Sequence, residues 1–209
     1  MKRQSLVGIA FAFACASPAQ ATPITFGFTG SVTQVPADDP GGGIGFGSAI
    51  IGQYTFDSAA LDGIANPAQA TYLSSGPGFG LSVQIGSNTY AVSGALNVNM
   101  SNDVSGVDQY GVLADDFTAL SISLFLEDWS AAVFSSDALP VVAPAIGSFA
   151  VRDFHLVDTS TGDVQIDGTI DTLTCLQGCG GGNPVPEPGT LALLAAGLLA
   201  AALRRRPFN

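Results

Sequence analysis

Apolar and polar residues alternate along most of the chain, with the two-residue period of a strand that buries one face. The segment from Leu120 to Leu126 shows this pattern most clearly, because every second residue is leucine or isoleucine. Glycine, asparagine and aspartate, which favour turns, separate the segments. The same alternation occurs in residues 24–32, 50–56, 79–85, 90–92, 96–100, 120–126, 149–156 and 164–170.

The turns and the parity of these segments indicate the fold class. Gly86-Ser87-Asn88 predicts a hairpin between residues 79–85 and 90–92. The buried parity changes between Val151 and Phe154, which predicts a β-bulge near residues 152–153. Residues 66–73 favour at most two helical turns. Since no strand–helix–strand rhythm is present, we expect an all-β domain, an antiparallel β-sandwich or jelly roll.

The first 21 residues have the three regions of a secretory signal peptide. Lys2 and Arg3 supply the charge, residues 6–16 are apolar, and Ala19-Gln20-Ala21 is a small-x-small cleavage site. Cleavage after Ala21 would leave Thr22 as the first mature residue. We therefore expect a signal helix over residues 1–21, handled by the Sec translocon and signal peptidase, and an exported domain over residues 22–177.

The C-terminal residues combine three features in a fixed order. The prolines of Pro186-Glu187-Pro188 fix φ and favour an exposed extended segment. Residues 190–203 follow as an apolar helix, which predicts a single transmembrane helix after a Gly/Pro linker at 178–185. Three arginines then remain in the cytoplasm by the positive-inside rule: Arg204, Arg205 and Arg206.

Two simpler interpretations of this end are a plain membrane anchor and a buried terminal helix. The apolar run 191–203 would span only about 20 Å, against roughly 30 Å of hydrocarbon. Neither interpretation accounts for the tripeptide and the arginines together. The three features of residues 186–209 resemble the PEP-CTERM sorting signal. That resemblance implies that an exosortase in the inner membrane recognises Pro186-Glu187-Pro188 and processes the protein there.

Charge is distributed unevenly between the two ends and the exported domain. Apart from the terminal segments, Arg152 is the only basic residue and faces sixteen of the seventeen Asp and Glu residues, a formal charge of about −15. Such a surface repels nucleic acid and anionic lipid, so we expect neither as a partner through the domain. The domain also contains no lysine, which excludes P-loop and Schiff-base chemistry.

Two cysteines remain after signal cleavage, Cys175 and Cys179, and they lie close together in the sequence. In an oxidising compartment this spacing favours a short-loop disulfide. A metal site would need further ligands, and the single histidine, His155, has no recognisable metal-binding spacing. Free thiols with a structural role are the remaining alternative.

Candidate chemistry is limited to carboxylates and one histidine. His155 could contact Asp153 on the same strand face, but no Gly-x-Ser-x-Gly elbow is present for a serine hydrolase. Adjacent pairs such as Glu127 and Asp128 point to opposite faces of a strand, which disfavours a glycosidase pair within one strand. Acids that flank turns are weak candidates for one calcium ion: Asp57, Asp62, Glu127, Asp128, Asp158 and Asp163.

These observations favour a non-enzymatic protein of the cell envelope or extracellular matrix. We expect it to be held first in the inner membrane by its C-terminal helix, with the domain in the periplasm, and then at the cell surface or in the matrix after processing. Association with exopolysaccharide is expected, with neutral sugars stacking on Trp129 or Tyr110. The alternatives are an envelope carbohydrate-active hydrolase with paired carboxylates and a calcium-dependent binding or adhesion module. No cofactor other than calcium is indicated.

Overall fold

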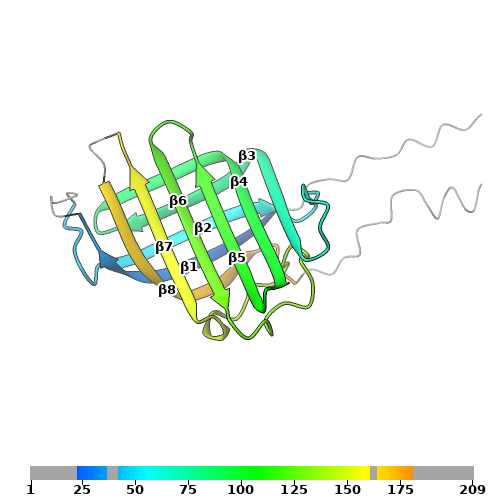
Figure 1. The fold of residues 1–209 in the computed structure, drawn as a ribbon. Helices are drawn as coiled ribbons and strands as arrows, with labels where there is room; N and C mark the ends of the chain where they lie inside the picture. Colours follow the sequence, from blue (N-terminus) through cyan, green and yellow to red (C-terminus); the bar gives the residue numbers. More distant parts are fainter. Residues whose placement is uncertain (1–22, 37–41, 161–163, 181–209) are drawn as a thin grey trace, which may run out of the picture. The chain divides into compact units, whose positions relative to one another are not determined.

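Eight antiparallel strands form a closed barrel in the computed structural model, which describes residues 23–36, 42–160 and 164–180 (Figure 1). Each strand pairs with its neighbours in sequence, and the first strand also pairs with the last. The strands are β1 (Pro23–Gln34), β2 (Ala49–Asp57), β3 (Gln69–Ile85), β4 (Asn88–Val104), β5 (Val107–Asp115), β6 (Leu120–Asp128), β7 (Val151–Asp158) and β8 (Val164–Gln177). A short 3-10 helix, η1 (Ile146–Ser148), precedes β7.

The expectation of a β-sandwich or jelly roll is therefore wrong. The strands are antiparallel as expected, but β1 pairs with β2 on one side and with β8 on the other, so the sheet has no free edge. Alternation along each strand specifies which face is buried, and it is the same in a sandwich and in a barrel. The expected signal helix (1–21) and transmembrane helix (190–203) lie outside the described residues. Within the described residues, no helix has the length and apolar character needed to cross a membrane.

The seam between β1 and β8 is bent by register shifts and close backbone contacts. Three shifts interrupt the pairing, between Thr25 and Phe26, between Thr29 and Gly30, and between Val32 and Gln34. Such irregularities increase strand twist and allow a sheet to curve into a barrel. A Cβ atom at Gly30 would lie 2.3 Å from a carbonyl oxygen of β8. Glycine therefore allows the two backbones to approach where the barrel closes.

Inward-facing side chains from every strand fill the barrel. Phe26 makes edge-to-face contacts with Tyr54 and Phe56, with ring centroids 5.7 and 5.3 Å apart. Eight strands leave an interior that side chains alone can fill. The largest fully buried side chains are Tyr54, Tyr110, Phe26, Phe28, Phe56, Phe154, Ile24, Ile50, Ile85, Leu96, Met100 and Ile122.

Two local predictions for the strands are also wrong. Residues 66–73 form a turn and the start of β3 rather than helical turns. The pairing of β7 with β6 and β8 is continuous, so the strand has no bulge at residues 152–153. Phe149 is buried but lies in the loop before β7, so the alternation of a strand does not apply to it. The hairpin turn between β3 and β4 is confirmed.

Candidate functional site

The strand directions place the two ends of the described domain at one end of the barrel, here called the exit end. Thr25 near the start of β1 pairs with Gln177 at the end of β8. The β2–β3 loop (58–68), the β4–β5 turn (105–106) and the β6–β7 loop (129–150) lie at the same end, as their strand directions require. Any segment that follows residue 180 in the chain therefore starts at the exit end.

The β6–β7 loop is attached to the exit end through a buried carboxylate, Asp108. Its Oδ2 accepts the amide N–H groups of Val133 (2.9 Å) and Phe134 (2.8 Å), and its Oδ1 accepts the amide of Asp103 (2.8 Å). The Phe134 ring contacts Tyr110 in the core, with centroids 6.4 Å apart. One fully buried side chain therefore joins the end of β4 to the β6–β7 loop.

Two further contacts fix the same loop. Asp128 accepts hydrogen bonds from the amides of Ala132 and Ser130, both at 2.9 Å, and these bonds lower the pKa of its carboxyl group. The Tyr72 hydroxyl donates to the backbone carbonyl of Asp137 at 3.1 Å. The loop is thus a hydrogen-bonded cover over the exit end rather than a loose connection.

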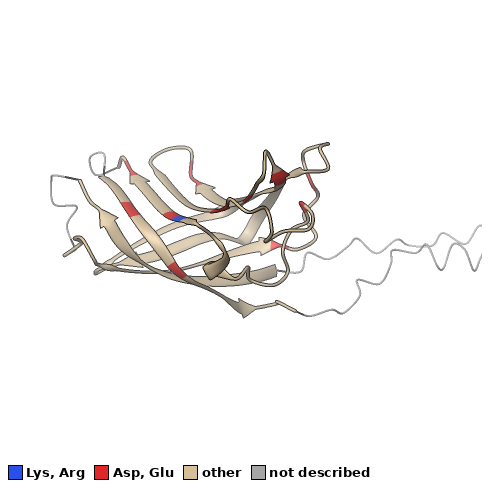
Figure 2. Cartoon of the chain, turned by 60° about the horizontal axis from the view of Figure 1, so that its bottom comes forward, with Lys and Arg blue, Asp and Glu red and all other residues tan. Residues whose placement is uncertain are grey.

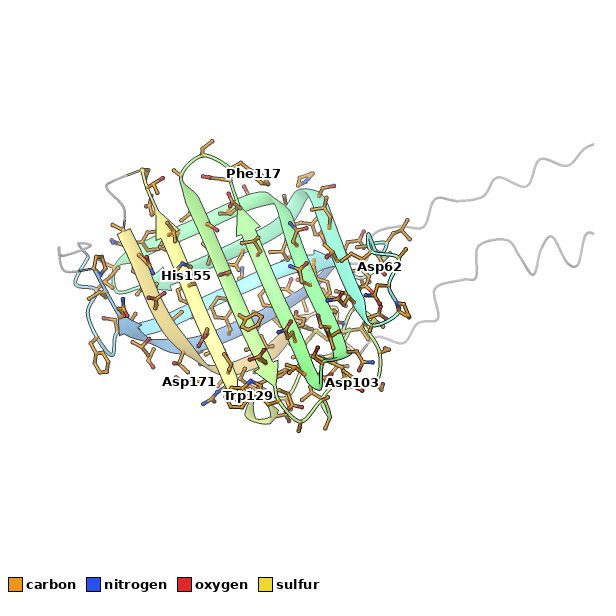
Figure 3. All side chains as sticks on the ribbon, viewed as in Figure 1. Asp62, Asp103, Phe117, Trp129, His155 and Asp171 are labelled. Atoms are coloured by element: carbon orange, nitrogen blue, oxygen red, sulfur yellow. A yellow bond between two sulfur atoms is a disulfide. The ribbon has the colours of Figure 1, made fainter. Side chains whose placement is uncertain are left out.

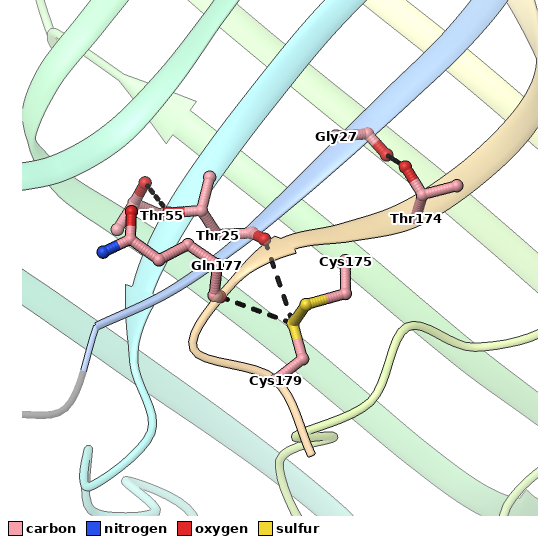
Figure 4. The surroundings of a disulfide bond; sticks show 7 residues. All are labelled: Thr25, Gly27, Thr55, Thr174, Cys175, Gln177 and Cys179. Carbon is pink, nitrogen blue, oxygen red and sulfur yellow. Dashed lines mark hydrogen bonds between the residues drawn. A yellow bond between two sulfur atoms is a disulfide. The ribbon is translucent and has the colours of Figure 1, made fainter. Parts of the chain in front are cut away.

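A disulfide joins Cys175 and Cys179 at the end of β8, which confirms the predicted pairing (Figure 4). The Cys179 sulfur lies 3.9 Å from the carbonyl oxygen of Thr25 in β1. The amide of Gly180 donates to the carbonyl of Val141 in the β6–β7 loop at 3.2 Å. The chain is therefore held to β1 and to the loop up to the point where the described domain ends.

The interior of the barrel is a structural core. The hydroxyl groups of Tyr54 and Tyr110 share a hydrogen bond of 2.8 Å, and burial raises the pKa of both. Tyr110 is fully buried, so the expectation that sugars stack on it is wrong. Trp129 is 66% exposed, and its indole N–H donates to Glu127 at 2.7 Å. Figure 3 shows it near the same end of the barrel as Asp103.

The calcium candidates are used in local turns and are not brought together. Asp57, Asp62 and Asp158 each accept the amide of the residue two positions later, which are Asx turns. Glu127 points outward to Gln109 and Trp129, whereas Asp128 is buried on the other face. Asp163 lies outside the described residues. Among residues 23–36, 42–160 and 164–180, no three His, Cys, Asp or Glu side chains form a metal-binding group.

His155 pairs with Asp167 of β8 rather than with Asp153 as the sequence suggested. The two are directly opposite in the β7–β8 register, and Nδ1 of the imidazole contacts Oδ1 of the carboxylate. Ser123 of β6 lies opposite His155 on its other side. Sequence spacing could not reveal this row, because it depends on the register of three strands. A serine nucleophile would need a hydrogen bond to its histidine base, and in the described structure none joins Ser123 to His155. The histidine side chain is 43% exposed.

The predicted processing and sorting residues lie outside the described residues. These are Ala19, Ala21 and Thr22 at the signal cleavage site, the tripeptide Pro186-Glu187-Pro188, and Arg204, Arg205 and Arg206. Their assignments rest on the sequence and on comparison with known proteins.

The comparison with protein families identifies the C-terminal segment. The family described as "PEP-CTERM protein-sorting motif" matches residues 184–206. No curated protein and no solved structure matches the chain. The chain therefore carries the PEP-CTERM sorting motif and is an exported protein that an exosortase sorts. The motif begins five residues after Cys179, the second cysteine of the disulfide at the end of the last strand of the barrel.

Proposed function

We propose that this protein is a non-enzymatic component of the cell envelope or extracellular matrix that associates with exported polysaccharide. The observation that carries the proposal is the sorting motif at residues 184–206, which follows directly after a closed, filled and disulfide-tied barrel. A sorting signal attached to a rigid domain suits a protein whose role depends on where it is placed.

The arrangement of the acids supports a binding role more than a hydrolytic one. Glycoside hydrolysis uses two carboxyl groups on either side of the scissile bond, within about 10 Å of each other. Glu127 and Asp128 point to opposite faces of β6, and Asp116 caps the β5–β6 turn through three backbone amides. These carboxylates stabilise turns and loops. Trp129 remains exposed at the exit end and is available to stack on a sugar ring.

The route that we propose has three steps. The Sec translocon and signal peptidase act at residues 1–21. The apolar segment 190–203 holds the protein in the inner membrane with the barrel in the periplasm. Exosortase processing then allows transfer to the cell surface or matrix. The strongly acidic domain supports this view, because it disfavours binding to nucleic acid or anionic lipid on the way.

The test is intact-mass analysis of the mature protein from cells with and without the exosortase, combined with fractionation of the matrix. We expect a shortened C-terminus near residues 186–188 in the first cells, and a chain that extends to Asn209 in the second. We also expect the processed protein to co-elute with matrix polysaccharide and to separate from it after the polymer is depolymerised. Identical masses would refute the processing step, and free protein in all matrix fractions would refute the association.

A further inference from the structure

The outer face of β1 to β4 is almost uncharged although the domain is strongly acidic. β1 and β3 contain no charged residue, and β2 and β4 contain one each, Asp57 and Asp103, close to the exit end. Most other acids lie in loops and at strand ends, and Asp153, Asp167 and Asp171 lie in β7 and β8 (Figure 2). One side of the barrel therefore presents neutral side chains to solvent.

A shallow hollow of about 210 Å³ lies on this neutral face, over β2, β3 and β4. Strand register explains its position, because two outward-facing rows cross the three strands there. Gln53, Ser82 and Ala91 form one row, and Thr55, Gly80 and Ser93 form the next. The residues between them, including Tyr54, Leu81 and Val92, point into the core.

Gly80 and the residues before it create the depression. Gly80 has φ of 143°, and an added Cβ would lie 2.2 Å from the carbonyl oxygen of Val92, so this position must lack a side chain. The pairing register of β3 and β4 shifts between Ser75 and Gly80. Residues 76–79 of β3 therefore face a single residue of β4, Gly94, and form a bulge. Phe79 lines one side of the hollow from this bulge. The hollow therefore has a floor of small residues and one aromatic wall.

The polar groups of the hollow are available to a ligand. Within the described structure, the side chains of Gln53, Ser82 and Ser93 have no hydrogen-bond partner in the protein. The Thr55 hydroxyl pairs with that of Thr25 on β1 at 2.9 Å, which continues the row of hydroxyl groups beyond the hollow. An amide and several hydroxyls can both donate and accept, which matches the alternating donors and acceptors of sugar hydroxyls.

We propose that this hollow binds a segment of a neutral polysaccharide, with a sugar ring against Phe79 and its hydroxyls bonded to Gln53, Ser82 and Ser93. The inference names the ligand class for the association proposed above and rests on it. All ten lining residues are uncharged, so the hollow offers no charge to pair with an acidic polymer, while the net charge of the domain repels one. An open, shallow hollow also suits a polymer that continues past the site at both ends.

The test uses the purified full-length protein and two probes, the neutral and the acidic polysaccharide fractions of the producing cells, separated by anion exchange. Affinity electrophoresis in native gels measures the retardation of the protein by each polymer. We expect the neutral fraction to retard it and the acidic fraction to leave its mobility unchanged. Phe79→Ala and Ser82→Glu should each weaken binding roughly tenfold, the effect of losing one anchoring contact.

Matched variants on the opposite side of the barrel serve as controls. Phe125→Ala removes an exposed aromatic ring from the outer face of β6, and Ser123→Glu adds a charge to a half-buried serine of the same strand. Both should bind like the wild type. Circular dichroism of every variant checks that the barrel is folded. A weakened Ser82→Glu variant with a native spectrum supports the proposal even where Phe79→Ala does not fold.

The remaining outcomes separate this proposal from the one on which it rests. If Trp129→Ala abolishes binding while both hollow variants bind normally, the hollow is not the site but the association with polysaccharide stands. Binding only to the acidic fraction would overturn the assignment of a neutral ligand. If the wild type binds neither fraction, the hollow proposal and the polysaccharide association both fail, whereas sorting by the exosortase is tested separately by mass.

Discussion

The hydroxyl groups of Tyr54 and Tyr110 meet inside the barrel at 2.8 Å, although the two residues are 56 positions apart. Tyr54 belongs to β2 and Tyr110 to β5, so their bond crosses the core rather than a strand pair. Each hydroxyl is the only hydrogen-bond partner of the other among the described residues, and both side chains are fully buried. A pair of this kind is costly to break from one side, because the remaining hydroxyl cannot reach water.

Removal of one hydroxyl should therefore destabilise the barrel more than removal of both. We expect Tyr54→Phe or Tyr110→Phe to lower the free energy of unfolding by about 1–3 kcal/mol. The double variant should lose less than either single variant, and therefore less than their sum, since no unpaired hydroxyl remains. Urea unfolding of the four proteins measures this double-mutant cycle. Additive losses would show that the two hydroxyls do not interact.

Asp108 should control the attachment of the β6–β7 loop. Asp108→Asn replaces one carboxylate oxygen with an NH₂ group. That group cannot accept hydrogen bonds from the backbone amides that now donate to the carboxylate. We expect a loss of about 2–4 kcal/mol in unfolding free energy. Faster hydrogen exchange at Val133 and Phe134 should accompany it. The control is Asp153→Asn on the exposed face of β7, which should change neither measurement. Unchanged exchange in Asp108→Asn would show that the carboxylate does not hold the loop.

Acid should destabilise the barrel through carboxylates that accept hydrogen bonds. The amides of Ala119, Leu120 and Thr118 hold the pKa of Asp116 far below its ordinary value of 3.8. Hydrogen bonds from Trp129 and Gln109 similarly lower the pKa of Glu127. Because these pKa values are lower in the folded state, the stabilisation is complete above the unfolded pKa and is lost as pH falls below it.

The urea midpoint should therefore be lower at pH 3 than at pH 7. Asp116→Asn should reduce this difference, because it removes one of the titrating groups. Asp171→Asn, which changes an exposed acid of β8 (Figure 3), is the control and should keep the wild-type difference. An equal pH dependence in wild type and Asp116→Asn would contradict the role of the β5–β6 turn.

Sorting and retention should be separable within the C-terminal segment. Replacement of Pro186-Glu187-Pro188 with alanines should leave the protein unprocessed and membrane-bound, because we expect the exosortase to recognise the tripeptide and the membrane to hold the apolar segment after it. Replacement of Arg204, Arg205 and Arg206 with neutral residues should weaken retention and release unprocessed protein, since those charges oppose translocation. Intact mass and membrane fractionation measure both effects. Wild-type processing of the alanine variant would show that the tripeptide is not the signal.

Sequence patterns predicted most of the strands but not their closure into a barrel. The alternation in 24–32, 50–56 and 120–126 corresponds to β1, β2 and β6, because each of these strands buries one face. β5 was missed, although Tyr110, Val112 and Ala114 alternate with half-buried residues. The pairing of β1 with β8 has no local signal, because it joins residues more than 130 positions apart.

For the candidate sites too, the sequence predicted contacts between nearby residues but not contacts that depend on strand register or tertiary structure. The disulfide could be predicted because its cysteines are four residues apart in an exported chain. The partner of His155 could not, because Asp167 reaches it only through the register of β7 and β8. The role of Asp108 in holding a loop 25 residues further along depends on tertiary contacts in the same way. The hollow requires the outward rows of three strands and the position of Gly80, none of which is visible in a single segment.

The seam between β1 and β8 also bears on how fast the fold can form. Thr29 and Thr172 bond across it at 2.6 Å but are 143 residues apart, so the barrel has a high contact order at its point of closure. Contacts between such distant residues form slowly, because a long loop must close first. A chain that crosses the membrane from its N-terminus would expose an unpaired edge of β1 until β8 emerges. Unpaired edges are sites of aggregation, so we expect the exported chain to be most prone to aggregate before its last strand arrives.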